Sequence, residues 1–450
     1  MCQHKSLFKA YDLRGRVPDE LDAGLAYRIG RGYCQLYQPA RVAVGFDIRN
    51  ESPGLARALI AGLTDGGADA VNIGLCGTEE VYFAVFNGKL DGGIMVTASH
   101  NPKGYNGMKL VGPEARPISG ETGLLRLRDL LIENEFSAVQ GRGREIAQSN
   151  KSDYIAHLLS YIDLGELRPL KMVANPGNGG AGAMVKLLAA QLPFEFIYIH
   201  EKPDGDFPNG VPNPLLVENQ ATTAEAVRAH KADLGLAWDG DFDRCFFFDA
   251  QGDFIEGYYL VGLLAQTMLA QHPGATIVHD PRLTWNTIEQ VGAAGGRAVQ
   301  SRCGHAFIKQ AMRERNALYG GEMSAHHYFR DFSYCDSGMI PWLLICALLS
   351  RSGQSLRELV AERVQAYPCS GEINFRVNEV AAVMERVLRR FERDATHIDR
   401  TDGIGMDFAD WRFNLRASNT EPLLRLNVEA RGDRSLMERQ LAALVKLIEC

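Results

Sequence analysis

Six short apolar runs along the chain each end in a polar loop, and this alternation indicates the fold class. The runs cover residues 42–46, 92–96, 171–174, 234–238, 276–278 and 317–319. Helical stretches separate them, and strands that alternate with helices are typical of α/β proteins. The runs fall into three pairs, which suggests three similar α/β units, although the internal sequence similarity is too faint to establish duplication. Because ligands bind beyond the carboxyl ends of strands in open α/β sheets, the six loops are the expected site.

The pattern changes near Pro368. Beyond it, the predicted strands are residues 372–377, 406–415 and 423–429, and the predicted helices are residues 380–394 and 435–449. This mixture predicts a C-terminal α+β module. A chain of 450 residues is also too long for one ordinary hydrophobic core. We therefore expect three α/β domains followed by one α+β domain, at residues 1–150, 151–252, 253–366 and 367–450.

The composition argues against several classes of protein. A net charge of -7 leaves no basic excess for a nucleic-acid backbone. Residues 1–9 lack the apolar segment of a secretory signal, and the apolar stretches 258–270 and 339–349 are shorter than the about 20 residues that cross a bilayer. Nine cysteines without a C-x-x-C pair argue against a zinc ribbon and a disulfide framework. We expect a cytoplasmic protein without a nucleic-acid or membrane partner.

Three aspartates, Asp239, Asp241 and Asp243, alternate in the loop after residues 234–238. In an extended segment their side chains point the same way, and such crowded like charges repel one another unless a cation lies among them. Carboxylate oxygens favour a hard ion such as Mg²⁺. An EF-hand is excluded, because Arg244 stands where that loop needs glycine. The alternative is a solvated acidic turn, and the apolar runs on both sides of the loop make it less favoured.

Residues 177–182 read G-x-G-x-x-G between a predicted strand and a helical stretch, residues 184–192. This pattern supports an alternative function, an NAD-dependent oxidoreductase, with Glu201 as the acidic residue expected about 20 residues further on. However, no complete second nucleotide-binding half follows. Tight strand-to-helix turns also use glycine for steric reasons alone.

Three further loops carry groups that suit phosphate or sugar chemistry. Ser99, in residues 97–102, is either a phosphate carrier or a turn residue, and glycine is absent from the flanks that a G-x-S-x-G elbow needs. Residues 416–422 supply a guanidinium, two hydroxyls and an amide, which suit a phosphate dianion or form a turn closed by proline. In residues 321–326, Glu322, Ser324 and His326 present an acceptor and donors in one direction, as sugar hydroxyls require. A lone histidine at such a position is more often structural.

These loops, taken in order, resemble the α-D-phosphohexomutase superfamily, and within it the bacterial phosphomannomutase/phosphoglucomutase group. The four motifs are residues 97–102, 239–244, 321–326 and 416–422, and the likeness extends from residues 8–15 to the last motif. It implies three related α/β domains and a smaller C-terminal α+β domain around a central cleft. Phe242 and Ala325 stand where glycine is common, and neither change removes a functional group.

The resemblance also implies roles for individual residues. Ser99 would carry a phosphoryl group, and Asp239, Asp241 and Asp243 would bind Mg²⁺ together with it. Beside the reaction centre would lie Tyr11, Arg14, His100, Lys109 and Arg244. General acid/base catalysis would fall to Lys109, His100 or Arg14. The substrate would contact Arg282, His305, Glu322, Ser324, His326, Arg416, Ser418, Asn419, Thr420 and Arg425.

The implied activity is the interconversion of mannose 6-phosphate and mannose 1-phosphate, and also of the glucose phosphates. It would proceed through a phosphoserine and a hexose 1,6-bisphosphate, which also serves as activator. Met323 favours mannose, or mannose together with glucose. The enzyme would be a monomer that binds hexose phosphates and supplies nucleotide-sugar precursors for cell-surface polysaccharide. A sugar-phosphate-binding protein without activity is a further alternative, against which Ser99 and the three aspartates count.

Overall fold

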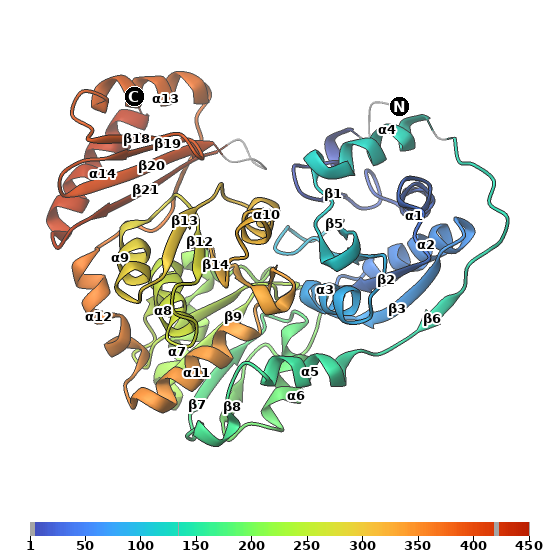
Figure 1. Ribbon diagram of the computed structural model, residues 1–450, viewed down its shortest axis with the longest axis horizontal. Coiled ribbons are helices and arrows are strands. Elements are labelled where there is room, and N and C mark those ends of the chain that lie inside the picture. The colour runs from blue at the N-terminus through green and yellow to red at the C-terminus, as the bar shows by residue number, and fades with distance from the viewer. Residues whose placement is uncertain (1–4, 134, 418–422, 450) are drawn as a thin grey trace. The chain divides into compact units, whose positions relative to one another are not determined.

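The computed structural model describes residues 5–133, 135–417 and 423–449. The chain forms two compact units. Unit 1 comprises Met1–Phe254 and Asp331–Gly353, and unit 2 comprises Ile255–Arg330 and Gln354–Cys450. Figure 1 labels their helices and strands. Within the described residues, no helix is both long enough and apolar enough to span a membrane.

The first sheet of unit 1 has the strand order β1-β5-β4-β2-β3-β6. Its strands are β1 (Leu13–Arg16), β2 (Arg41–Phe46), β3 (Asp69–Leu75), β4 (Gly92–Val96), β5 (Tyr105–Val111) and β6 (Glu145–Ala147). Its helical segments are η1 (Lys5–Leu7), α1 (Ala23–Tyr37), α2 (Ser52–Asp65), α3 (Thr78–Asn87), η2 (Pro113–Ala115), η3 (Gly120–Leu124) and α4 (Leu125–Glu133). One apolar core joins α1, α2 and α4 to the strands. Because β4 is buried along its whole length, the loop after it starts from a fixed position.

The second sheet of unit 1 has the order β11-β10-β9-β7-β8. Its strands are β7 (Lys171–Asn175), β8 (Glu195–Tyr198), β9 (Leu234–Trp238), β10 (Cys245–Phe248) and β11 (Phe254–Ile255). The helical segments along this part of the chain are α5 (Lys151–Leu159), η4 (Leu164–Glu166), α6 (Ala181–Ala189), η5 (Val217–Asn219) and α7 (Ala221–His230). A later helix, α11 (Ile340–Ser352), joins this unit, since Trp342 packs on Phe196 and Cys346 contacts Met172. The apolar stretch 339–349 is therefore a buried helix.

Unit 2 contains a mixed sheet, in which β14 and β15 are antiparallel and β12 is parallel to β13 and β14, and an antiparallel sheet. The strands of the first run in the order β13-β12-β14-β15, and those of the second run in the order β17-β21-β20-β19-β18. Their bounds are β12 (Thr276–His279), β13 (Arg297–Gln300), β14 (Tyr319–Gly321), β15 (His327–Phe329), β17 (Ile373–Phe375), β18 (His397–Asp399), β19 (Ile404–Asp407), β20 (Trp411–Ala417) and β21 (Leu424–Ala430). The helices are α8 (Gly257–Leu269), α9 (Trp285–Ala293), α10 (His305–Arg315), α12 (Leu356–Ala366), α13 (Val380–Phe391) and α14 (Arg434–Glu449). The short elements η6 (Arg330–Phe332) and β16 (Cys335–Asp336) follow β15 along the chain.

Three of the sheets repeat one strand order. The matching sets are β5-β4-β2-β3, β10-β9-β7-β8 and β15-β14-β12-β13. In each set the first two strands are antiparallel and the other neighbours are parallel. The two predicted runs of each pair form the two central strands, so the polar loops after them leave from one edge. The α/β class with three related units is confirmed, and the fourth sheet with α13 and α14 is the α+β module.

Two predicted strands differ from the structure. The run 406–415 is a hairpin, not one strand, because the chain turns where the amide of Phe408 donates to the carbonyl of Trp411 at 2.9 Å. The run 317–319 is shifted, since β14 begins only at Tyr319. The predicted domain boundaries stay predictions.

Candidate active site

Ser99 lies in the loop after β4, where it contacts the aspartate loop after β9. Its backbone has a φ of 49°, and its amide donates to the Thr97 hydroxyl at 2.9 Å. Its own hydroxyl donates to Oδ2 of Asp239 at 3.0 Å. A Cβ atom at Gly240 would lie 2.6 Å from the Ser99 carbonyl oxygen, so only glycine fits at that position. Two loops 140 residues apart in the sequence thus meet at one hydroxyl.

Arg49, in the loop after β2, fixes the path of the Ser99 loop. Its buried guanidinium donates to the carbonyl oxygens of Ser99 at 2.9 Å and Asn101 at 2.6 Å. It also donates to the carbonyls of Pro102 and Tyr105, both at 3.0 Å. One side chain therefore satisfies four backbone acceptors, three in the Ser99 loop and one at Tyr105, the first residue of β5. No motif marks Arg49, and it was not predicted as a site residue, although β2 and β4 are parallel neighbours whose loops leave from the same edge.

The side chains of Asp239, Asp241 and Asp243 converge, as their spacing predicted. All three are buried, and each offers one carboxylate oxygen within 4.8 Å of the others. Oδ2 of Asp239 accepts from Arg244, whose Nε and Nη2 lie at 2.9 and 2.8 Å. The Lys109 ammonium bridges the other two, at 2.7 Å from Asp241 and 2.5 Å from Asp243.

The charges in this group favour a cation among the aspartates. Burial lowers the pKa of Lys109, but Asp241 and Asp243 outweigh it and hold that pKa above its usual range. Burial and the charge of Asp241 raise the pKa of Asp243 well above normal. Oδ1 of Asp241 is buried and accepts no hydrogen bond within the described part of the chain. Three converging carboxylates and an unsatisfied buried oxygen suit an oxygen-ligated divalent cation.

Two features behind the aspartate loop hold its shape. Thr78, the first residue of α3, donates its amide to the Asp241 carbonyl at 3.1 Å and its hydroxyl to the Asp241 carboxylate at 2.5 Å. Phe242 has a φ of 47°, so the loop keeps the left-handed backbone that glycine would adopt there. Its ring packs so closely on Gly77 that a Cβ atom at Gly77 would lie 2.2 Å from it. Thr78 belongs to no motif and was not predicted as a site residue.

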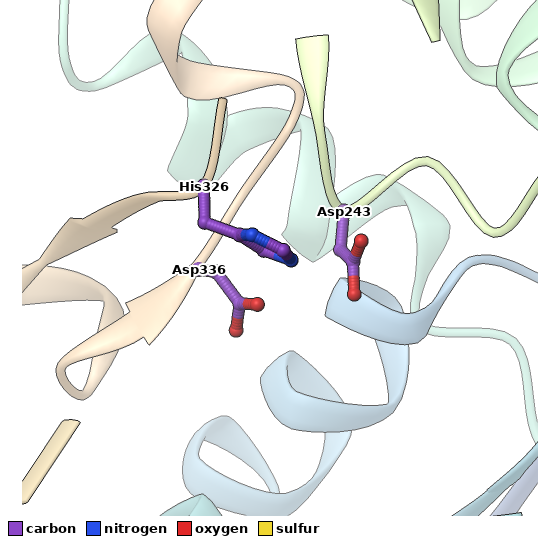
Figure 2. A group of neighbouring side chains, drawn as sticks. All are labelled: Asp243, His326 and Asp336. Atoms are coloured by element: carbon purple, nitrogen blue, oxygen red, sulfur yellow. The ribbon is translucent and has the colours of Figure 1, made fainter. Parts of the chain in front are cut away.

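Asp336 adds a fourth carboxylate to this group in unit 1. Figure 2 shows it near Asp243, and His326, drawn with them, belongs to unit 2. The negative charge of Asp336 contributes to the raised pKa values of Asp243 and Lys109. No sequence signal marked Asp336. It lies far from the aspartate loop in the sequence, in the segment Asp331–Gly353, which returns to unit 1 after a long stretch of unit 2.

His100, Arg244 and Arg14 complete the surroundings of Ser99. Nδ1 of His100 lies 2.6 Å from Nη2 of Arg244 and 3.1 Å from the Ser99 hydroxyl. A guanidinium can only donate, so Nδ1 accepts and a neutral ring carries its proton on Nε2. Arg14 donates to the Thr97 carbonyl at 3.4 Å and pairs with Asp12 at 2.8 Å. The structure therefore brings together the predicted Ser99, His100, Lys109, Arg14, Arg244 and the three aspartates, and Tyr11 precedes Asp12 in the same unit.

The glycine-rich turn at residues 177–182 packs against the aspartate loop. A Cβ atom at Gly179 would lie 3.1 Å from the Gly240 carbonyl oxygen, and one at Gly180 would lie 3.1 Å from the Phe242 ring. Glu201, the expected acidic partner of a ribose, pairs instead with Lys186 at 2.7 Å. These glycines are explained by close packing, and the oxidoreductase alternative is not supported.

In unit 2, Arg282 joins the predicted sugar loop. Its Nη2 atom lies 2.7 Å from Asp280, 3.2 Å from the Ser324 hydroxyl and 3.6 Å from Glu322. Glu322 also accepts from the amide of Gly304, which precedes His305 at the start of α10. His326 lies 3.8 Å from the same carboxylate, and Ala325 has a φ of 70°, as a glycine there would allow. The predicted Arg282, Glu322, Ser324 and His326 thus form one group, and His305 follows Gly304, whose amide donates to Glu322.

Arg416 and Arg425 are paired neighbours on β20 and β21. Each lies 3.2 Å from the carboxylate of Glu372, and so does Arg282. Glu372 was not predicted as a site residue; it was expected to begin a strand, which in the structure begins at Ile373. The predicted Ser418, Asn419 and Thr420 lie outside the described residues.

Comparison with known proteins agrees with this geometry. Models of the phosphoglucomutase/phosphomannomutase family match in order: α/β/α domain I at residues 5–136, domain II at residues 152–252, domain III at residues 256–367 and the C-terminal domain at residues 372–447. The chain is 58% identical over 441 residues to the phosphohexose mutases of Xanthomonas campestris and 57% identical over 450 residues to the phosphomannomutase of Salmonella typhimurium, with 98% of each chain covered. A solved phosphoglucomutase/phosphomannomutase family protein from Burkholderia thailandensis has a TM-score of 0.89 at 30% identity and covers 100% of this chain and 98% of its own.

The fold and these matches define a four-domain enzyme of the isomerase class, an intramolecular phosphotransferase. The chain belongs to the phosphoglucomutase/phosphomannomutase family.

Proposed function

We propose that the chain is a phosphomannomutase that interconverts mannose 6-phosphate and mannose 1-phosphate, and also glucose 6-phosphate and glucose 1-phosphate. The observation that carries the proposal is the Ser99 hydroxyl, 3.0 Å from a buried aspartate triad, in a chain whose relatives are phosphomannomutases. A hydroxyl in such a place can hold a phosphoryl group beside a divalent cation.

The cation would be Mg²⁺, held by Asp239, Asp241, Asp243 and the phosphate on Ser99, and it would offset the phosphoryl charge during transfer. Ser99 gives its phosphoryl group to the vacant hydroxyl of the hexose phosphate, so that one P–O bond breaks as another forms. The hydroxyl proton passes to a base. His100 is neutral here and Lys109 is charged, which are the states that a base and an acid need.

The substrate itself would be held by unit 2. Glu322 and Ser324 present an acceptor and a donor for sugar hydroxyls, with Arg282, His305 and His326 beside them. Arg416 and Arg425, with Ser418, Asn419 and Thr420, would hold the phosphate that does not react. The side chain of Met323 is buried against Asn427, which leaves the hydroxyl contacts to its two neighbours.

Hexose 1,6-bisphosphate would act as activator, since each bisphosphate that escapes leaves Ser99 without its phosphate and an added bisphosphate restores it. We further infer a cytoplasmic monomer whose mannose 1-phosphate supplies nucleotide-sugar precursors for cell-surface polysaccharide.

The function is tested by a coupled assay that compares mannose 1-phosphate with glucose 1-phosphate in the presence of Mg²⁺ and glucose 1,6-bisphosphate. Both sugars should be turned over, and turnover should depend on the bisphosphate. No turnover of either sugar would refute the proposed activity.

Replacing Arg416 by alanine should weaken both directions of the reaction to a similar degree. A mutase binds its substrate in two opposed orientations, and one receptor serves whichever phosphate does not react. Loss of one partner from a buried charge pair costs about 2–5 kcal/mol, or roughly tens- to thousands-fold in kcat/KM. Steady-state kinetics with hexose 1-phosphate and hexose 6-phosphate measures the effect, with Arg439→Ala on the surface of α14 as control. A large loss in one direction alone would indicate two separate phosphate pockets.

Replacing Arg49 by lysine should lower kcat without abolishing folding. Lysine donates from a single point and cannot reach four carbonyls, so the Ser99 loop loses part of its support. Bonds to a charged donor contribute about 1.5–3 kcal/mol each, so losing one or two predicts a fall of about tenfold or more. The matched control is Arg57→Lys, an exposed arginine on α2. Equal kcat values for the two variants would contradict the positioning role of Arg49.

A further inference from the structure

Three arginines of unit 2 converge on one carboxylate, that of Glu372. Nη1 of Arg282 and Nη2 of Arg416 each lie 3.2 Å from its Oε2, and Nη1 of Arg425 lies 3.2 Å from its Oε1. The Glu372 side chain is only 6% exposed, and so is that of Arg416. The loop after β12 that carries Arg282 is distant in sequence from β20 and β21, which carry Arg416 and Arg425, and all three guanidiniums contact Glu372.

The carboxylate fits this cluster loosely. Charge-assisted hydrogen bonds from guanidinium to carboxylate are usually about 2.7–2.9 Å long, whereas all three contacts here are 3.2 Å. In the described residues, the buried Nε atoms of Arg282 and Arg416 also have no hydrogen-bond acceptor. A tetrahedral anion offers one peripheral oxygen to each of three guanidiniums, which a planar carboxylate cannot do. The cluster is therefore better matched to a phosphate than to Glu372.

The balance of charge around the three arginines also indicates that Glu372 and a bound phosphate compete. Asp280 pairs with Arg282 at 2.7 Å, and Glu322 lies 3.6 Å from the same guanidinium. Burial raises the pKa of Glu372, but Arg282, Arg416 and Arg425 outweigh it and hold that pKa below its usual range, so Glu372 is ionised at neutral pH. When a phosphate dianion enters beside Asp280 and Glu372, the negative charges outnumber the three arginines. Glu372 is then repelled by the phosphate that takes its donors.

We propose that the Glu372 carboxylate and the non-reacting phosphate of the substrate compete for the same three guanidiniums. Without substrate, Glu372 accepts from Arg282, Arg416 and Arg425 and holds the three side chains together. When the phosphate binds, it accepts from the arginines in place of Glu372. This inference rests on the proposed function for its consequence in turnover. The bisphosphate intermediate of a mutase must leave this phosphate site and rebind with its other phosphate there. Release of the phosphate costs less free energy when the Glu372 carboxylate replaces it as the acceptor of the three guanidiniums. Glu372 is thus a positioning residue that weakens phosphate binding and speeds release.

The test compares Glu372→Gln with the wild type, because glutamine keeps the shape and removes the charge. Inorganic phosphate, titrated by calorimetry, should bind about tenfold more tightly to the variant, a shift on the scale of one buried charge interaction. The melting temperature without phosphate should fall, since the arginines lose their counterion, and phosphate should raise it more than in the wild type. In the mutase assay KM and kcat should both decrease. The control is Glu438→Gln, on the exposed surface of α14.

A purely structural role predicts the opposite, namely weaker phosphate binding and a higher KM as the arginines separate. Unchanged or weaker phosphate binding by Glu372→Gln would overturn the proposal. Glu372→Asp keeps the charge but shortens the side chain, so it should bind phosphate with intermediate affinity; weaker binding than the wild type would also overturn it, even where the glutamine variant fails to fold. Phosphate titration does not depend on mutase turnover. Tighter binding in a chain without mutase activity would therefore refute the proposed function and leave the role of Glu372 standing.

Discussion

Replacing Ser99 by alanine is expected to remove nearly all mutase activity while the fold is retained. The Ser99 hydroxyl is the group that Asp239 and His100 face, and alanine removes it without adding volume. Loss of a covalent nucleophile typically costs several orders of magnitude in kcat, so we expect a fall of at least about 10³-fold. The purified wild type should also carry an added mass of roughly 80 Da, one phosphoryl group, on the peptide that contains Ser99, and the variant should lack it.

Steady-state assay and intact-protein mass spectrometry measure both outcomes. The matched control is Ser160→Ala, an exposed serine in the same unit, which should keep full activity and the added mass. A stable phosphate on another residue, together with normal turnover in Ser99→Ala, would remove the basis for the assigned role of Ser99.

The second large effect is expected from the metal site. Excess chelator should abolish activity and Mg²⁺ should restore it. Asp241→Asn and Asp243→Asn should each weaken metal binding, because each removes one of three converging carboxylates. Their effects on the metal-free protein should differ. Asp243→Asn relieves like-charge crowding and should raise the melting temperature, whereas Asp241→Asn removes the charge that accepts from both Lys109 and Thr78 and should lower it.

Calorimetric titration with Mg²⁺ and thermal unfolding in chelator separate these effects. Asp153→Asn, an exposed aspartate on α5, is the control and should change neither quantity. Full activity in excess chelator would refute the metal assignment.

The alternation of apolar runs and polar loops predicted most of the fold because it has a direct structural cause. Parallel strands place their carboxyl ends at one edge, so the loops after β4 and β9 could be recognised before any contact was known. The hairpin in residues 406–415 was predicted as one strand, although the sequence carries a signal for its turn. The alternation of apolar residues changes phase there, from Met406 and Phe408 to Trp411, Phe413 and Leu415.

The residues of recognisable motifs were predicted as site candidates from the sequence, and those that contact them from distant parts of the chain were not. Arg49, Thr78 and Glu372 are ordinary polar residues in the sequence, and their importance arises from partners far along the chain. The glycine-rich turn shows the reverse case. Its pattern matches a dinucleotide site, but Gly179 and Gly180 are small because the aspartate loop packs against them.

The central claim is that Ser99 donates its phosphoryl group to the substrate and recovers another from it. A single-turnover experiment tests this directly, using enzyme with radioactive phosphate on Ser99 and an equimolar amount of unlabelled mannose 1-phosphate. The account predicts that the label leaves the protein within one turnover and appears in mannose 1,6-bisphosphate and then in the hexose monophosphates. Label that stays on the protein while mannose 6-phosphate forms, or that is released as inorganic phosphate, would contradict it.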